Sequence, residues 1–324
     1  PRVVRFRPPI SPSFRDCPMS TRPESLAGVA HVDCSGRTAL ITGSTNGIGR
    51  AAALALGRLG ADVFVHGRDP DAGAAVVDEL TGLGVRATFQ AADFTDPDAV
   101  RELADAVRSW SDGLDLLLNN AGGLFQDDAV VGTGVEITFH VNHLAPYLLT
   151  AHLLDHLNGD ARIVTTASAA HRGSTLALDR VRGDNLLSGM NAYSHSKLAN
   201  VLFASELARR LDAAGHTLTS NSVHPGFVPG SQFGRFLPGP LATLFRGLGL
   251  VPGTSSVADG AAELLVPAVA PETADVSGRY FTGQAPVTPS EAARDPDAAT
   301  HLWRESARML GINEPLADAC PSVS

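Results

Sequence analysis

A tyrosine and a lysine four residues apart could together move a proton. The stretch AYSHSKLANVLF (192–203) contains Tyr193 and Lys197, and a helix places side chains at this spacing on one face, with Cβ atoms roughly 6 Å apart. A positive charge about 4 Å from a phenol is worth roughly 4 kcal/mol at an effective dielectric of 20, or up to about three pKa units toward phenolate. Lys197 is therefore expected to bring Tyr193 toward the range of a general acid or base. In an ordinary helix the same pair only packs a ring and solvates an ammonium.

A glycine-rich turn supplies the context that the pair lacks. The stretch TGSTNGIGR (42–50) comes directly after a β-rich run and directly before a helical pattern. Gly43 permits a tight turn, Gly47 lets the backbone approach a pyrophosphate, and Gly49 lets the helix pack closely on the strand. The first N–H groups of the helix then bind the phosphates. The sequence predicts a dinucleotide site here, in preference to a purely structural turn.

The end of the second predicted strand indicates which dinucleotide is bound. NAD sites place an acid there for the ribose 2′-hydroxyl, whereas an arginine nearby accommodates the 2′-phosphate of NADP. The chain reads VHGRD at 65–69, so Arg68 stands where the acid of an NAD site is expected. Asp69 is expected just past the strand, and the alternative interpretation of Arg68 is an ordinary surface charge. The predicted cofactor is NADP(H).

Short β-rich runs alternate with helical patterns from residue 38 onward. This alternation predicts an α/β fold, a Rossmann-type doubly wound parallel sheet in a single domain that spans residues 34–324. The Asp96-Pro97 pair predicts a helix start. Strands are expected at 38–42, 61–66, 85–90, 114–118, 161–166 and 217–224.

The composition excludes several classes of protein. Among 324 residues, 44% are hydrophobic and 18% are charged, which suits a large core and not a disordered chain. A net charge of -9 argues against a nucleic-acid-binding protein. No apolar run reaches the roughly 18 residues that a membrane span needs. Three cysteines without a Cys-x-x-Cys pair predict neither a disulfide framework nor a zinc site, so a cytoplasmic location is expected.

Several histidines invite a metal hypothesis, which the spacing does not support. His140, His143, His152 and His156 stand at helical spacings, but no carboxylate or cysteine lies at a metal-motif spacing from them. Solvated helix faces are the expected explanation, and no metal is predicted. His195 lies between the tyrosine and the lysine, and helical geometry turns it away from them, so a structural role is expected.

The first 33 residues differ from the rest of the chain. PRVVRFRPPISPSFRDCPMSTR contains five arginines, one acid and several prolines without periodicity, so residues 1–33 are expected to form a disordered arm. The apolar region of a secretory signal is missing from it. Because the chain opens on Pro1 and contains Met19, translation is expected to start at Met19.

Together these motifs resemble the short-chain dehydrogenase/reductase family over residues 35–312. The cofactor turn (42–49), NNAG (119–122) and Tyr193-x-x-x-Lys197 occur in the family's order. The stretches VNHLAPYLLT, RIVTTASAAH and YSHSKLANVLF look like its retinol-dehydrogenase-like branch, which oxidises or reduces apolar alcohols and carbonyls. The resemblance implies catalytic roles for Ser168, as a donor to the substrate oxygen, and for Asn142, in a proton relay.

The resemblance also implies the cofactor contacts. Asp93 would contact the adenine, or else cap a helix, and Asn119 would line the cofactor cleft from a strand end. The family commonly has a threonine or serine that bonds the nicotinamide carboxamide, and here that place is Gly230, with Ser231 beside it. The predicted cofactor-binding set is Gly43, Ser44, Thr45, Asn46, Gly47, Ile48, Arg68, Asp93, Asn119, Ala121, Tyr193, Lys197, Pro225 and Gly226.

The predicted function is hydride transfer between NADP(H) and a carbonyl or alcohol. Residues 227–255 interleave phenylalanine and leucine with glycine and proline, so they are expected to close over a bulky apolar ketone or aldehyde. Packing of these side chains on the core or on another subunit is the alternative. A non-catalytic NADP-binding sensor and a nucleotide-sugar epimerase remain as other functions. The expected partner is a small apolar molecule, not nucleic acid or a membrane, and the sequence leaves a homo-oligomer open.

Overall fold

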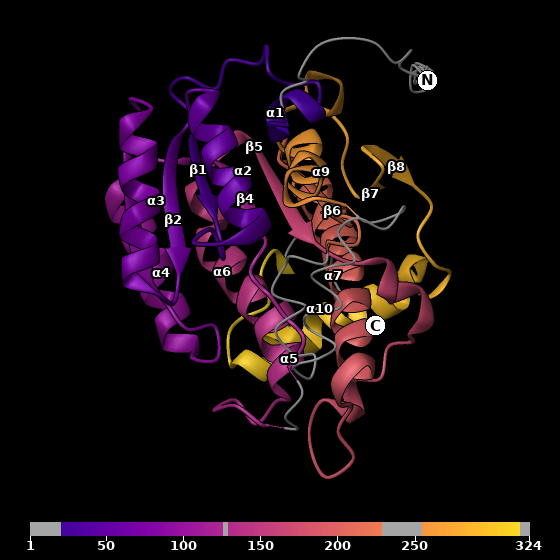
Figure 1. The fold of residues 1–324 in the computed structure, drawn as a ribbon. Coiled ribbons are helices and arrows are strands. Elements are labelled where there is room, and N and C mark those ends of the chain that lie inside the picture. The colour runs from indigo at the N-terminus through magenta and orange to yellow at the C-terminus, as the bar shows by residue number, and fades with distance from the viewer. Residues whose placement is uncertain (1–20, 126–128, 229–254, 318–324) are drawn as a thin grey trace, which may run out of the picture.

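The protein is built around one mixed β-sheet (Figure 1). The computed structural model describes residues 21–125, 129–228 and 255–317. The strands are β1 (Thr38–Ile41), β2 (Asp62–Gly67), β3 (Ala87–Ala91), β4 (Leu114–Asn119), β5 (Leu157–Thr166), β6 (Thr219–Val223), β7 (Tyr280–Thr282) and β8 (Ala285–Val287). Their order is β3-β2-β1-β4-β5-β6-β7-β8. All neighbours are parallel except β7 and β8, which are antiparallel.

The sheet confirms the predicted doubly wound α/β fold. Each of the predicted runs overlaps one of the strands β1 to β6, although β5 begins at Leu157 and not at 161. Strands β7 and β8 were not predicted, because strands of three residues carry almost no periodic signal. Strand β1 pairs with β2 on one side and β4 on the other, so the strand order reverses there. A crevice is expected outside the carboxyl ends of strands at such a reversal.

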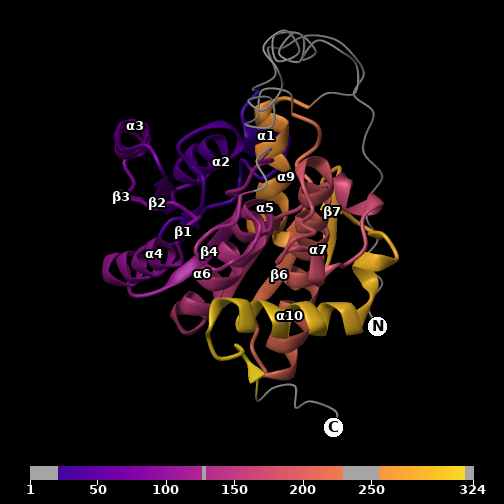
Figure 2. The same cartoon turned by 90° about the horizontal axis from the view of Figure 1, so that it is seen from below.

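Two layers of helices cover the sheet (Figure 2). Strand side chains alternate between the layers: Leu40 and Phe64 belong to one buried apolar cluster, and Ile41 and Val63 to the other. Burial on both faces explains why these strands are continuously apolar. The first layer consists of α1 (Pro23–Leu26), α2 (Gly47–Arg58), α3 (Pro70–Gly82) and α9 (Val257–Val269), and the second of α4 (Pro97–Trp110), α5 (Ile137–Phe139), α6 (Ala145–Leu153), α7 (Gly189–Ala213) and α10 (Pro296–Leu310).

Three long helices begin with the same two-residue signal. Asp69, Asp96 and Asp295 each cap a helix, and each is followed by proline at the first helical position. The aspartate oxygen accepts N–H groups of the first turn, and proline lacks the N–H that would be unsatisfied there. The helix start predicted at Asp96-Pro97 is confirmed. Short 3₁₀ turns lie at Leu154–His156, Ala169–Gly173, Leu178–Arg180, Pro271–Thr273 and Ala292–Arg294.

The expectation of a disordered arm up to residue 33 is wrong for residues 21–33. These residues contain α1, and Val29 is fully buried against the layer of α2 and α9. Glu24 is also buried, where its carboxylate accepts bonds from Nε and Nη2 of Arg58 at 2.6 and 2.8 Å. A polar, proline-containing stretch can therefore be ordered by one apolar anchor and one ion pair. Residues 1–20, with Met19, lie outside the described residues.

The expectation that His140 and His143 lie on a solvated helix face is also wrong. Both are buried in a π-helical turn, His140–Leu144, between α5 and α6. His140 Nδ1 lies 3.0 Å from Thr133 Oγ1, and His143 Nε2 lies 2.8 Å from Ser306 Oγ of α10. The covering by α10 could not be read from local spacing. In the described part of the chain, no group of three or more His, Cys, Asp or Glu residues is placed to hold a metal.

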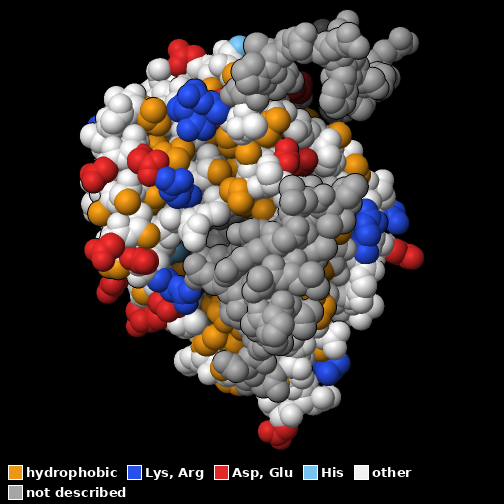
Figure 3. Space-filling model, in the orientation of Figure 1, with side chains coloured by type: hydrophobic (Ala, Val, Ile, Leu, Met, Phe, Trp, Pro, Cys, Tyr) orange, Lys and Arg blue, Asp and Glu red, His pale blue; other side chains and the backbone are white. Residues whose placement is uncertain are grey.

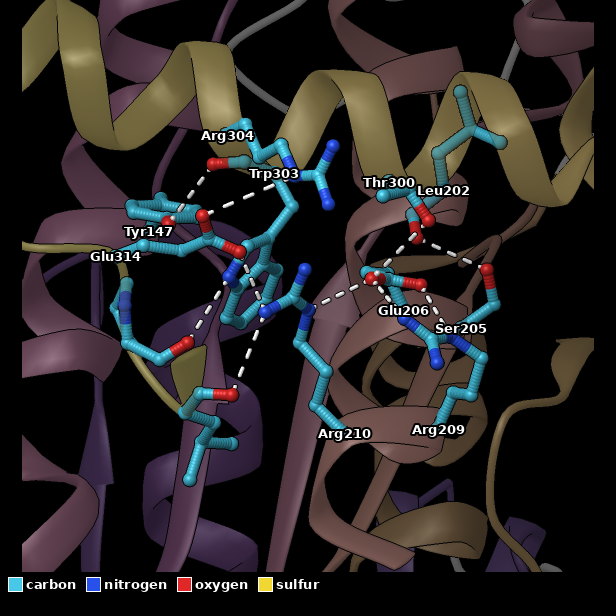
Figure 4. A network of polar contacts seen from close by, with 12 residues as sticks. Tyr147, Leu202, Ser205, Glu206, Arg209, Arg210, Thr300, Trp303, Arg304 and Glu314 are labelled. Atoms are coloured by element: carbon cyan, nitrogen blue, oxygen red, sulfur yellow. Dashed lines mark hydrogen bonds and ion pairs between the residues drawn. The ribbon is translucent and has the colours of Figure 1, made fainter. Parts of the chain in front are cut away.

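A buried ionic cluster fastens the C-terminal segment to α7 (Figure 4). The Arg210 guanidinium donates to Glu206 on its own helix at 2.7 Å and pairs with Glu314 beyond α10 at 2.7 Å. It also lies over the Trp303 ring, 4.9 Å from the centroid, and Tyr147 OH donates to the Trp303 carbonyl at 3.0 Å. This cluster holds α10 across α6 and α7.

Within the described ranges, no helix has both the length and the apolar character needed to cross a bilayer.

Candidate active site

A cavity of ≈ 590 Å³ lies at the carboxyl ends of the strands, beside the reversal of strand order. On the face in Figure 3, Lys and Arg side chains lie in separate groups, most of them near acidic side chains. Most of the predicted site residues meet in this cavity. They are Gly43, Thr45, Asn46, Gly47, Ile48, Arg68, Asp93, Ala121, Ser168, Tyr193, Lys197, Pro225 and Gly226.

The glycine turn forms a close-fitting cradle at one end of the cavity. Gly43 has φ +66°, and a Cβ there would lie 3.0 Å from Ala121 Cα. A Cβ at Gly49 would lie 2.3 Å from the Gly43 carbonyl oxygen, whereas one at Gly47 would meet open space. Asn46 caps α2 by accepting the Gly47 N–H at 2.6 Å. The glycines thus leave the backbone of the turn without side chains, and the N-terminus of α2 points at the cavity. Both features fit the diphosphate of a dinucleotide.

The charged side chains that follow β2 and β3 differ in how closely other groups bind them. The Asp69 carboxylate accepts the N–H groups of Asp71 and Ala72 as the cap of α3, as its expected position past the strand requires. Asp93 does not cap a helix, because its Oδ1 accepts from Thr95 N and Oγ1, both at 2.9 Å. The Arg68 side chain is 61% exposed, with Nη1 3.9 Å from Asp93 Oδ2. A basic group that forms only a long ion pair with Asp93 therefore stands beside the cavity.

Three catalytic candidates converge at the other end of the cavity. Tyr193 and Lys197 lie in the first turns of α7, and a side-chain hydrogen bond joins Tyr193 to Ser168, which caps the turn Ala169–Gly173. The Lys197 ammonium is buried, donates to the Thr166 carbonyl at 3.0 Å and lies 5.5 Å from the centroid of the Tyr193 ring. Asn200 Nδ2 donates to the same carbonyl at 3.0 Å. The arrangement places a phenol, a hydroxyl and an ammonium around one space.

In the protein alone, burial acts on the pKa of Tyr193 against the effect expected of the Lys197 charge. Desolvation raises the pKa of Tyr193, and its hydrogen bond to Ser168 offsets only part of this effect. Burial also lowers the pKa of Lys197 to about 8, and its Nζ donates to a carbonyl and not to the phenol. Local spacing predicted the charge but not the desolvation, which acts on both groups. In the protein alone, Tyr193 is therefore held protonated.

Asn142 lies behind the catalytic residues and not in the cavity wall. Its Oδ1 accepts the Gly123 N–H at 2.8 Å, and its Nδ2 donates to the Gly123 carbonyl at 2.8 Å and to Ser196 Oγ at 3.0 Å. Ser196 Oγ in turn donates to the Tyr193 carbonyl at 2.8 Å. The π-helical turn presents this amide to both segments, a distortion that is frequent at functional sites. Asn142 thus connects the loop after β4 with the first turn of the catalytic helix.

Two predicted cofactor residues turn away from the cavity. Ser44 is buried and donates through Oγ to the Ile41 carbonyl at 2.7 Å, and Asn119 Nδ2 donates to Thr150 Oγ1 at 3.0 Å. The next residue, Asn120, lines the cavity instead and donates to the Thr42 carbonyl at 2.9 Å. Successive residues at a strand end point to opposite sides, so the NNAG motif located the site but not which asparagine lines it.

Other residues that line the cavity were not predicted from the sequence. Met190 precedes Tyr193 by three residues, and the shared helical face was a signal that could have identified it. Phe125, Val141 and His66 also line the cavity, and nothing in their local sequence distinguishes them from core residues. Tertiary structure alone brings these segments to one wall.

Comparison with known families identifies the fold and its chemistry. Residues 37–235 match the family model described as short chain dehydrogenase. The chain belongs to the short-chain dehydrogenase family. Short-chain dehydrogenases are NAD(P)-dependent oxidoreductases, and the predicted resemblance to the family is confirmed.

Individual relatives refine this assignment. The chain is 35% identical over 295 residues to Retinol dehydrogenase 13 of Homo sapiens, with 86% of each protein covered. It is 38% identical over 284 residues to Polyprenol dehydrogenase of Mus musculus, with 85% of this chain and 84% of the relative covered. A short chain dehydrogenase from Burkholderia cenocepacia J2315, crystallised in complex with NADP, superposes with a TM-score of 0.62 at 30% identity, covering 81% of this chain and 99% of that chain. The retinol-dehydrogenase-like resemblance is thereby confirmed.

Proposed function

We propose that the protein reduces bulky apolar ketones or aldehydes with NADPH. The observation that carries the proposal is the convergence of Ser168, Tyr193 and Lys197 at one end of a cavity whose other end holds the glycine cradle and Arg68. A dinucleotide that spans such a cavity would bring its nicotinamide to the three catalytic candidates, where it supplies the hydride.

The preference for NADP(H) rests on the two residues after β2. Asp69 would be the acid able to hold an unmodified ribose, but its Oδ1 accepts the N–H groups of Asp71 and Ala72 in the first turn of α3. Arg68 stands beside the cavity with an exposed guanidinium, which suits the fork geometry of a phosphate contact. The NADP in the related Burkholderia cenocepacia structure agrees with this preference.

The protein's own groups supply the proton and orient the substrate. Ser168 would donate to the carbonyl oxygen, and the protonated Tyr193 would transfer its proton as that oxygen gains negative charge. Lys197 would stabilise the phenolate that remains, since its ammonium lies beneath the Tyr193 ring. In the protein alone, burial raises the pKa of Tyr193, so the phenol carries the proton that reduction needs.

Apolar side chains form the wall where the substrate would lie. Phe125, Val141, Met190, Phe227 and Val228 all line the cavity. Retinol and polyprenol, which the names of two relatives mention, are long apolar alcohols. Most of the predicted substrate segment, residues 229–254 with Gly230 and Ser231, lies outside the described residues. Its described ends are joined, because the Ser255 N–H donates to the Phe227 carbonyl at 2.8 Å.

A substrate panel tests the proposal. Ketones and aldehydes of increasing apolar size would be followed by nicotinamide absorbance with NADPH and with NADH, and the Met190→Ala variant would be run beside the native protein. We expect kcat/KM to rise with apolar size, to be higher with NADPH, and to fall about fivefold or more for large substrates in the variant, since an apolar contact is worth about 1–3 kcal/mol. A preference for small polar carbonyls, or for NADH, would contradict the proposal.

A further inference from the structure

His66 lies between the two loops that would hold the adenosine half of the cofactor. It stands at the end of β2, is 3% exposed and lines the cavity. Its Nδ1 lies 3.1 Å from the Gly43 N, as the acceptor of that N–H, and its Nε2 lies 3.1 Å from the Ala92 carbonyl oxygen. A backbone N–H can only donate, so Nδ1 carries no proton. Nε2 must then carry one and donate it to Ala92.

The surrounding contacts leave the ring little freedom. The His66 backbone N–H donates to Ser44 Oγ at 3.1 Å, and its carbonyl accepts the Ser44 N–H at 2.8 Å. The ring stacks on Phe94, with centroids 4.5 Å apart and planes 20° apart. Next to it, the Gly67 carbonyl accepts the Ala92 N–H at 3.1 Å. One residue therefore ties the glycine turn, the end of β2 and the start of the loop after β3 to one another.

We propose that His66 is a positioning residue for the cofactor, which sets the glycine turn and the loop of Asp93 at the separation that an adenosine diphosphate moiety requires. The diphosphate would contact the turn after Gly43, and the adenosine would contact the loop after Ala92. The imidazole is the bridge between these two contacts, so its loss would let them move apart. The inference rests on the cofactor-binding part of the proposed function and not on the substrate.

The bridge requires a neutral ring with one defined tautomer. Burial lowers the pKa of His66 to about 4, although the Ala92 carbonyl and the Asp93 carboxylate favour the charged form and Arg68 opposes it. An imidazolium could not accept the Gly43 N–H, and the other neutral tautomer would place two N–H groups against each other. At neutral pH the geometry therefore admits one protonation state.

Two substitutions separate the two hydrogen bonds of the ring. In His66→Asn, the amide oxygen lies near the position of Nδ1 and keeps the acceptor for Gly43, whereas in His66→Gln the longer amide reaches the position of Nε2 and keeps the donor to Ala92. We expect the dissociation constant of NADPH, measured by nicotinamide fluorescence on the full chain, to rise about tenfold in each variant, because loss of either hydrogen bond breaks the bridge. With saturating NADPH, kcat should stay within about twofold in both.

His143→Gln is the matched control. It also alters a buried histidine with a polar partner, Ser306, but His143 does not line the cavity. It is expected to lower thermal stability and to leave the NADPH dissociation constant unchanged. A dissociation constant within about twofold of the native value in either His66 variant, or a loss in the control as large as in the His66 variants, would overturn the inference.

A measurement on the native protein covers the case in which a variant does not fold. The ¹⁵N chemical shifts of the His66 ring at neutral pH should report a neutral ring protonated at Nε2. A proton on Nδ1 would refute the bridge. If the native protein does not bind NADPH at all, the proposed cofactor is wrong, and this result is distinct from binding that is indifferent to His66.

Discussion

The two ends of the cavity use charge in opposite environments. At the end near β2 and β3, the side chains of Arg68 and Asp93 are 61% and 49% exposed. At the end near α7, Lys197 is 4% exposed and its ammonium is bonded to a backbone carbonyl. An exposed charge costs little to maintain and contributes little until a ligand covers it. Burial of a charge destabilises the folded protein. The buried charge can then stabilise charge that develops in the reaction without any reorganisation of its surroundings.

This difference predicts which property of the protein a substitution at each end should change. Substitutions at the exposed end should alter which dinucleotide binds and leave the fold unaffected. Substitutions at the buried end should change catalysis and stability together, with opposite signs, because the groups that catalyse are the groups that the fold desolvates.

The largest effect is expected from removal of the proton donor. Tyr193→Phe should lower kcat for reduction about a hundredfold or more, since general acid catalysis contributes on that scale, and should leave the dissociation constant of NADPH within about threefold. Steady-state kinetics and fluorescence titration measure the two quantities. Tyr147→Phe is the control, because it removes another buried phenol whose hydroxyl donates to Trp303 outside the cavity. Near-native turnover of the Tyr193 variant would refute its assigned role.

The next effect concerns stability. The pKa of Lys197 falls from 10.5 to about 8 in the folded protein. At pH 7 the lysine is nevertheless protonated, so burial of its charge lowers the free energy of unfolding. At about 1.4 kcal/mol per pKa unit, Lys197→Met should stabilise the protein by about 1–3 kcal/mol while lowering activity. The Thr166 carbonyl stays satisfied by Asn200.

The sign of the pH dependence provides the check. The cost of burying Lys197 is present below pH 8 and disappears as pH rises from about 8 to 10.5, where the unfolded lysine also loses its proton. Urea unfolding at pH 7 and at pH 9.5 should show the advantage of Lys197→Met shrinking at the higher pH. A Met variant that is less stable at pH 7 would show that the ammonium stabilises the fold.

The smallest effect is expected at the exposed end. Arg68→Ala should raise the dissociation constant of NADPH about tenfold and leave that of NADH within about twofold, because one charge-assisted bond to the 2′-phosphate is lost. Arg86→Ala is a matched control: the Arg86 side chain is also 61% exposed, but it pairs with Asp62 and does not line the cavity. Equal losses for both dinucleotides would mean that Arg68 is structural.

The sequence by itself determined the fold class and the chemistry. Strand and helix periodicity, the glycine turn and the Tyr193–Lys197 spacing are local patterns, and each depends on backbone geometry within a few residues. The Asp96-Pro97 pair likewise located a helix start, because capping is a local hydrogen bond. For the same reason, the turn and the catalytic helix were predicted with their residue numbers.

Tertiary structure alone decided burial and the direction in which polar side chains point. His140 and His143 follow a surface-like spacing, yet both are buried, and helix α10 covers His143 from far along the chain. Asn119 and Asn120 are equivalent in the motif, and only packing turns one of them to Thr150 and the other to the cavity. Desolvation is a sum over all neighbours in space, so no local pattern could predict that burial raises the pKa of Tyr193.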